Sequence, residues 1–175
     1  MIAATAARIR ALADSRGPTL GDGRLVCIDG PAGSGKTTVA AAIDAPTVHM
    51  DDLFRGWDGL ATVDPTVRGV VEPLMHGRPG RYQRWDWITA APAEEHLVAP
   101  APLLVIEGVG AGTRAWAALC TVLVWVESDP VTRLARGIAR DGEKVRERWE
   151  KWMVDEQELF ARERTRARAD LVVPT

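Results

Sequence analysis

The sequence predicts a three-layer α/β domain, in which a five-stranded parallel sheet carries helices on both faces. Five short apolar runs are separated by segments with mostly helical patterns, and strands that alternate with helices form parallel sheets. The runs consist almost entirely of valine, leucine and isoleucine, as expected for strands buried on both sides. The predicted strands are residues 24–29, 46–50, 102–108, 121–127 and 169–173.

Length and composition favour one domain, residues 1–175, because 46% apolar residues can form one sizeable core. With 22 basic and 24 acidic residues, the chain lacks the positive charge typical of nucleic-acid binding. Residues 1–17 contain no apolar stretch that resembles an export signal or a membrane span, so we expect a cytoplasmic protein without a membrane partner. Cys27 and Cys120 lie in apolar runs and are expected to stay free thiols. The oligomeric state stays open.

Two further segments have recognisable patterns. Near the N-terminus, apolar residues at helical spacing predict a docked amphipathic helix; they are Ile2, Ala6, Ile9 and Ala13. Residues 55–101 interrupt the alternation of strands and helices. We expect this segment to form an insertion on the substrate side, over the edge of the sheet, with one helix from Pro65 to His76.

A glycine-rich loop is the strongest functional signal. "GPAGSGKT", residues 30–37, fits the pattern of Gly, four residues of any kind, Gly, Lys, and Ser or Thr, between a predicted strand and a predicted helix. The glycines let backbone N–H groups turn inward around a phosphate at the positive end of the helix. Lys36 would reach the β and γ phosphates, and Thr37 would offer its hydroxyl to Mg²⁺. The predicted nucleotide-binding residues in this loop are Gly30, Ala32, Gly33, Ser34, Gly35, Lys36, Thr37 and Thr38.

Acidic residues follow two of the predicted strands. Glu107 ends strand 102–108, and Asp51 and Asp52 follow strand 46–50. The carboxyl edge of an open parallel sheet is where such proteins bind ligands. A carboxylate there can accept the proton of an acceptor hydroxyl aligned with the γ-phosphate. The alternative is that the aspartates are solvated loop residues or a helix cap.

An arginine-rich helix follows the fourth strand. At about 100° per residue, Arg133, Arg136 and Arg140 lie within roughly 60° of one another on one face of this helix. The opposite face, predicted to pack on the protein, contains Val131, Leu134, Ala135 and Ile138. Residues 133–144 are therefore predicted to form a lid whose guanidiniums stabilise a transferring phosphate. A merely solvated basic face is the alternative.

These motifs together resemble the uridine kinase group of the P-loop kinases. "GPAGSGKT", "DDLFR", "IEG", "RLARGIARD" and "ADLVVP" occur in that family's order, and the resemblance spans residues 24–174. It implies a P-loop kinase fold with ATP and Mg²⁺ as cofactors. By position it implies Asp51 as the catalytic base beside Lys36, Arg136 and Arg140. Metal contacts, direct or through water, would come from Thr37, Glu107 and Asp51.

The resemblance does not extend to the acceptor site. The family's Tyr-Asp-His-Pro-like run is not found, and the nearest segment is "RYQRWDW", residues 81–87. Extended backbone would place Tyr82, Arg84 and Asp86 on one face. The predicted acceptor contacts are Asp51, Asp52, Arg55, Trp57, Tyr82, Asp86 and Arg133, the last also counted with the nucleotide-binding residues. A structural hairpin that packs its tryptophans is the alternative.

The function expected is that of a kinase that transfers the ATP γ-phosphate to a hydroxyl of a nucleoside or related metabolite. A nucleoside monophosphate kinase-like enzyme, or a nucleotide-dependent ATPase or switch with a protein partner, stays open. In the penultimate helix, the apolar stripe predicts core packing; it comprises Trp149, Trp152, Met153, Leu159 and Phe160. Glu156 lies within that stripe and needs a partner, which a lid arginine or the middle segment of the chain could supply.

Overall fold

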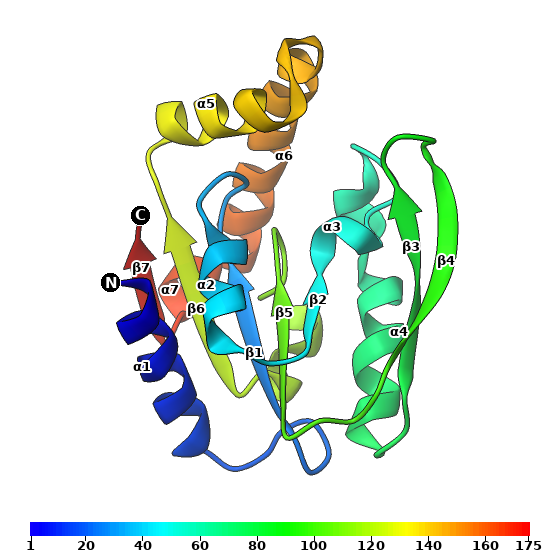
Figure 1. Ribbon diagram of the computed structural model, residues 1–175, viewed down its shortest axis with the longest axis vertical. Helices are drawn as coiled ribbons and strands as arrows, with labels where there is room; N and C mark the ends of the chain where they lie inside the picture. Colours follow the sequence, from blue (N-terminus) through cyan, green and yellow to red (C-terminus); the bar gives the residue numbers. More distant parts are fainter.

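Five parallel strands form the central sheet, in the order β2, β5, β1, β6, β7 (Figure 1). The structure, a computed structural model, describes residues 1–175. Each strand overlaps the run that predicted it, which confirms the predicted fold class. The strands are β1 (Arg24–Asp29), β2 (Thr47–His49), β5 (Leu103–Glu107), β6 (Val122–Glu127) and β7 (Leu171–Pro174).

Helices cover both faces of this sheet. On one face α1 (Ile2–Asp14) and α2 (Lys36–Ile43) bury apolar residues against β1, β5 and β6. Ala6, Ile9 and Ala13 of α1 are buried as predicted, whereas Ile2 at its first turn is 45% exposed. On the other face, α4 (Asp64–Met75), α6 (Arg146–Glu163) and the 3₁₀ segment η2 (Arg114–Leu119) enclose the larger core.

The segment after β2 forms a separate antiparallel hairpin. A short helix, α3 (Met50–Leu53), and the 3₁₀ segment η1 (Gly59–Thr62) lead into α4, which occupies nearly the predicted residues. Strands β3 (Gly80–Asp86) and β4 (Ala91–Val98) then pair only with each other. β3 contacts α3 and α4, so the hairpin lies outside the β2 edge of the main sheet (Figure 1).

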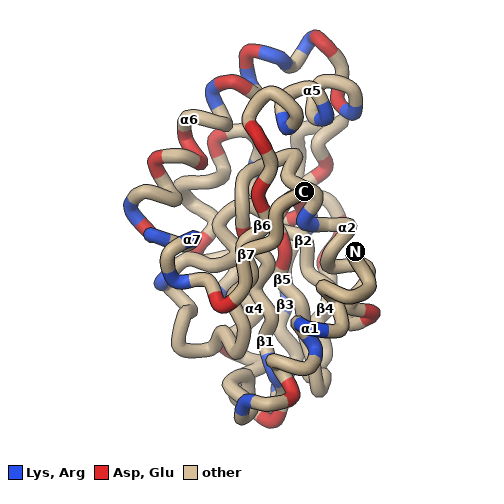
Figure 2. The backbone as a smooth tube through the Cα atoms, turned by 90° about the vertical axis from the view of Figure 1, so that its left-hand side faces the viewer, with Lys and Arg blue, Asp and Glu red and all other residues tan.

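The C-terminal part carries a helical hairpin above the carboxyl edge of the sheet. It consists of α5 (Pro130–Asp141), the 3₁₀ turn η3 (Glu143–Val145) and α6, and the short α7 (Thr165–Arg168) then leads to β7. Acidic and basic residues are interspersed along α6 (Figure 2). No helix combines the length and apolar character that crossing a membrane requires. Cys27 and Cys120 are free thiols, as predicted.

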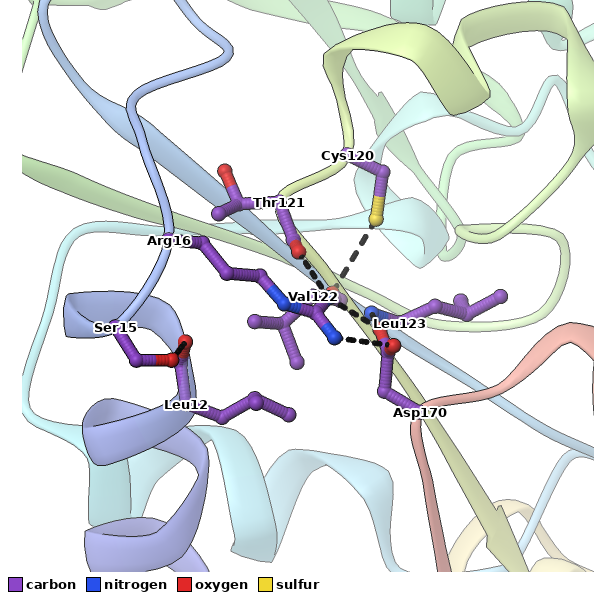
Figure 3. Close-up of polar contacts among 8 residues, drawn as sticks. All are labelled: Leu12, Ser15, Arg16, Cys120, Thr121, Val122, Leu123 and Asp170. Atoms are coloured by element: carbon purple, nitrogen blue, oxygen red, sulfur yellow. Dashed lines mark hydrogen bonds and ion pairs between the residues drawn. The ribbon is translucent and has the colours of Figure 1, made fainter.

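The opposite, amino edge of the sheet is held by an ion pair (Figure 3). Arg16, just after α1, donates to both carboxylate oxygens of Asp170, at 2.9 and 2.7 Å, and to the carbonyl of Thr121 at 2.6 Å. Asp170 also accepts the backbone N–H of Leu123 at 2.8 Å. These contacts join the N-terminal helix to the starts of β6 and β7, away from the glycine-rich loop.

Candidate active site

The glycine-rich loop lies between β1 and α2, packed against the ends of β6 and α5. At Gly30 an added Cβ would come within 2.0 Å of the Val126 carbonyl oxygen. Gly33 has a φ of +77°, and a Cβ there would lie 2.7 Å from the Arg133 carbonyl oxygen. Side chains are excluded at both positions by space and backbone conformation. The loop's path is therefore fixed by its neighbours as well as by its own sequence.

Lys36 begins α2 and is 6% exposed. Its Nζ donates to the Pro31 carbonyl at 2.9 Å, and burial lowers its pKa while four surrounding carboxylates raise it. Those carboxylates belong to Glu107, Asp29, Asp51 and Glu156. The fully buried Ser34 hydroxyl in the same loop has no hydrogen-bond partner. A buried cation and an unpartnered hydroxyl at a helix N-terminus fit the phosphate groups of a nucleotide.

Glu107 brings two predicted metal contacts together at the end of β5. Its Oε1 accepts the Thr37 hydroxyl at 3.0 Å, and the residue is only 5% exposed. Carboxylate and hydroxyl oxygens are donors that suit Mg²⁺, so these residues fit the implied metal. The same oxygen lies 2.6 Å from Nδ1 of His49, and this contact raises the pKa of the His49 imidazole. His49 was not predicted as a site residue.

Asp51 lies in the first turn of α3, directly after β2. The residue keeps an exposed surface. Nevertheless, the pKa of its carboxyl is raised, mainly because the nearby protein atoms reduce its contact with water. The negative charge of Glu107 raises this pKa further, whereas the positive charges of Lys36 and Arg140 lower it. Its backbone carbonyl accepts the indole N–H of Trp87 at 2.9 Å, which ties the β3–β4 hairpin to α3. Asp51 therefore lies within the electrostatic field of Lys36.

The predicted packing face of α5 is only partly correct, because Leu134 and Ile138 are half-buried but the other two residues are not. Arg133 and Gly137 are the buried residues of this helix, whereas Val131 is 79% exposed and Ala135 is also exposed. The physical reason is Gly137, which lacks a side chain and lets the Trp149 indole pack on the helix; a Cβ there would lie 2.4 Å from the ring. Arg133 is thereby turned inward, and α5 does not present three arginines on one open face.

Arg133 pairs with Glu156, so the partner of that carboxylate is a lid arginine, one of the two candidates, and not the middle segment. Arg133 Nη1 lies 2.7 Å from Oε1 of Glu156 and donates to the Ala32 carbonyl at 3.1 Å. Oε2 of Glu156 accepts the Ala32 N–H at 2.8 Å. Glu156 is 1% exposed, and its burial raises the pKa of its carboxyl. Helices α5 and α6 are thus both fixed to the phosphate loop at one residue.

The other two arginines of α5 stay exposed near the loop. Arg136 donates to the Gly33 carbonyl at 3.2 Å. Arg140 pairs with Asp141 at 2.8 Å, and its guanidinium lies 5.7 Å from the Trp149 ring centroid. The positive charge of Arg140 also lowers the pKa of the Asp51 carboxyl. Arg136 and Arg140 therefore lie on the exposed side of α5, whereas Arg133 is buried.

The predicted acceptor residues divide into structural and free groups. Asp86 Oδ1 accepts the N–H groups of Ile88 and Thr89, so it holds the hairpin turn, and the Tyr82 ring stacks on His96 at 5.2 Å. Asp52 and Arg55 make no hydrogen bond to protein and stay available. Trp57 packs edge-to-face in an indole cluster with Trp87, Trp149 and Trp152 at 5.6, 6.4 and 6.1 Å.

Asp29, which ends β1, is a buried site residue that the sequence did not reveal. Its Oδ1 accepts the N–H groups of Gly30 and Gly110 at 2.7 and 2.8 Å, and Oδ2 accepts that of Gly112 at 2.9 Å. Burial raises its pKa to about 6, and the three N–H donors and Lys36 limit that rise. Asp29 therefore joins the phosphate loop to the loop that follows Glu107.

This pKa predicts a pH-dependent stability. Between pH 4 and 6 the folded protein keeps a proton on Asp29 that the unfolded chain has lost, so the free energy of unfolding contributed by this group falls as pH rises. In Asp29→Asn this group no longer titrates, so the fall in the free energy of unfolding between pH 4 and 6 should be smaller by about 2–3 kcal/mol. Urea unfolding at several pH values measures it. Parallel profiles for the two proteins would contradict the assignment.

The fold and the loop define a structural class: the three-layer P-loop fold found in kinases. A solved structure described as a "putative fructose transport system kinase" from Silicibacter sp. TM1040 is similar, with 20% identity, 99% of each chain covered and a TM-score of 0.73. Another, a "possible uridine kinase" from Bacillus stearothermophilus, has 20% identity over 95% of this chain and 97% of its own, with a TM-score of 0.62. No family model and no curated protein matches the sequence.

Proposed function

We propose that this protein is an ATP-dependent phosphotransferase that moves the γ-phosphate to a hydroxyl of a small molecule. The observation that carries the proposal is the environment of the Lys36 side chain. This buried lysine lies at the loop and helix start that suit phosphates, and within range of Asp51 and Glu107. The kinase descriptions of the two similar structures agree with this reaction class.

Each residue then has a distinct task in the transfer. Lys36, the loop N–H groups and the Ser34 hydroxyl bind the triphosphate and orient its terminal phosphate. Thr37 and Glu107 would hold Mg²⁺, which when bound neutralises developing negative charge on the phosphate oxygens. Asp51 accepts the proton of the acceptor hydroxyl, and its raised pKa makes it a better base than an ordinary aspartate.

The lid helix supplies the remaining charge and keeps water out. Arg136 and Arg140 are exposed beside the loop and can approach the transferring phosphate, whereas Arg133 anchors the helix through Glu156. Exclusion of water matters because an open site would transfer the phosphate to water. The proposed acceptor is a nucleoside, on the motifs shared with uridine kinases. Asp52 and Arg55, which are free polar residues close to Asp51 in the chain, would orient this acceptor.

Lys36→Ala is expected to abolish the rise in melting temperature that ATP and Mg²⁺ produce. The substitution removes the only cation buried in the phosphate loop, so the triphosphate loses its main charge partner. Differential scanning fluorimetry with and without nucleotide measures the effect. Lys144→Ala, on the exposed η3 turn, serves as the charge-matched control. An unchanged shift in Lys36→Ala would contradict the nucleotide site.

A phosphoryl-transfer screen tests the reaction itself. ATP and Mg²⁺ would be incubated with nucleosides, nucleoside monophosphates, sugars and vitamin precursors, and phosphorylated products detected by mass spectrometry. Acceptor-stimulated turnover with a new phosphate ester supports the kinase. ATP hydrolysis that no acceptor increases, and that a protein partner enhances, would instead identify an ATPase or switch.

A further inference from the structure

We propose that His49 is a positioning residue for the metal–nucleotide complex: its imidazole holds the Glu107 carboxylate in the orientation that this complex needs. The inference rests on the proposed function. It assigns His49 no contact with the acceptor and no direct bond to the metal. Its role is exerted through one hydrogen bond to a carboxylate.

The register of the sheet places the two residues together. β2 and β5 run parallel, and His49 and Glu107, the last residue of each strand, are paired in the ladder. His49 Nδ1 lies 2.6 Å from Oε1 of Glu107. An ionised carboxylate can only accept, so the imidazole donates from Nδ1. The contact therefore joins two side chains that the strand pairing places next to each other.

The hydrogen bonds of Glu107 are distributed unevenly between its two oxygens. Oε1 accepts from both Thr37 and His49, whereas Oε2 has no donor in the protein. Without His49, only the Thr37 hydroxyl would hold the carboxylate, and its two oxygens could exchange by rotation about the terminal torsion. Thr37 is itself proposed to bind the metal. The hydrogen bond from His49 is therefore the only one to the Glu107 carboxylate that comes from outside the phosphate loop. The side chain of Glu107 is 6% exposed, so His49 and Thr37 provide most of its polar surroundings.

Removal of such orienting hydrogen bonds typically weakens metal affinity by about 10- to 100-fold. We therefore expect His49→Ala to weaken binding of a non-hydrolysable ATP analogue about tenfold in the presence of Mg²⁺. Binding in EDTA should be unchanged, because the loop contacts to the phosphates remain. His49→Asn, whose side-chain N–H can replace Nδ1–H, should retain most of the Mg²⁺-dependent affinity. Calorimetric titration without acceptor measures the three dissociation constants: that of His49→Ala with Mg²⁺, that of His49→Ala in EDTA, and that of His49→Asn with Mg²⁺.

The chain offers a closely matched control. His96 on β4 also faces a glutamate, with Nε2 2.9 Å from Oε1 of Glu94, and its side chain is 42% exposed, against 43% for His49. His96→Ala should therefore leave the Mg²⁺ dependence of nucleotide binding as in the wild type. This control shows whether the loss of any histidine–glutamate contact weakens nucleotide binding, or only the loss of the contact to Glu107.

Two results would overturn the inference while the proposed function stands. In the first, the wild type binds nucleotide with a Mg²⁺ dependence that His49→Ala does not alter. In the second, His49→Asn loses as much affinity as His49→Ala, which would show that the donated hydrogen bond is not what matters. If the wild type binds no nucleotide with or without Mg²⁺, the proposed function fails, and the inference fails with it.

Discussion

Glu156→Ala is expected to lower the free energy of unfolding by about 3–5 kcal/mol, because it leaves the buried Arg133 guanidinium without its counter-charge. The same change removes the acceptor of the Ala32 N–H in the phosphate loop. For a chain of this size the loss corresponds to a fall of roughly 10 °C in melting temperature. Urea unfolding and thermal denaturation measure the two quantities.

Two variants make this result specific. Glu156→Gln keeps the side-chain volume and one acceptor oxygen, but its amide nitrogen only donates and cannot replace the second acceptor. Its loss should therefore be smaller than that of Glu156→Ala by the one contact that it retains. Glu143→Ala deletes an exposed partner of Arg146, and an exposed pair of this kind contributes little to stability because water screens it. A loss below about 1 kcal/mol in Glu156→Ala would show that the buried pair does not stabilise the fold.

Asp51→Asn is expected to slow phosphoryl transfer by about 10²- to 10⁴-fold, because the amide cannot accept the proton of the acceptor hydroxyl. Nucleotide affinity should be retained or slightly improved, since a negative charge near Lys36 and the phosphates is removed. Steady-state kinetics with the acceptor identified by the screen give kcat, and calorimetry gives the affinity.

Asp58→Asn is the matched control, because Asp58 is an exposed aspartate shortly after α3 whose only partner is Lys151. It should leave both constants unchanged. The role of Asp51 as base would be refuted by a kcat within about twofold of the wild type, given the size expected for proton transfer. A matching loss of affinity in Asp51→Asn would place the residue in nucleotide binding instead.

The sequence predicted the strands and the loop because their signals are local. Each strand is an apolar run with polar ends, and the loop pattern from Gly30 to Thr37 is contiguous. The order of strands in the sheet is not local. His49 meets Glu107 only because β2 lies next to β5, a pairing of residues 58 positions apart that no periodicity records.

Other features depended on packing between distant elements. The inward turn of Arg133 requires that the Trp149 indole rest on Gly137, and helical spacing alone could not reveal this contact. Asp29 reads as an ordinary strand end until Gly110 and Gly112 donate to it. In contrast, Glu156 was recognisable as a residue in need of a partner, because a carboxylate in an apolar stripe violates the pattern of its own helix.

The indole cluster gives this protein an intrinsic optical reporter. Trp57 and Trp87 belong to the segment beside Asp51, whereas Trp149 and Trp152 belong to α6. Trp57 lies close enough to each of the other three for their excited states to interact. Relative movement of the lid and the hairpin would change both the emission and the near-ultraviolet circular dichroism. Stopped-flow measurements can therefore test for the proposed closing of the lid without an attached dye.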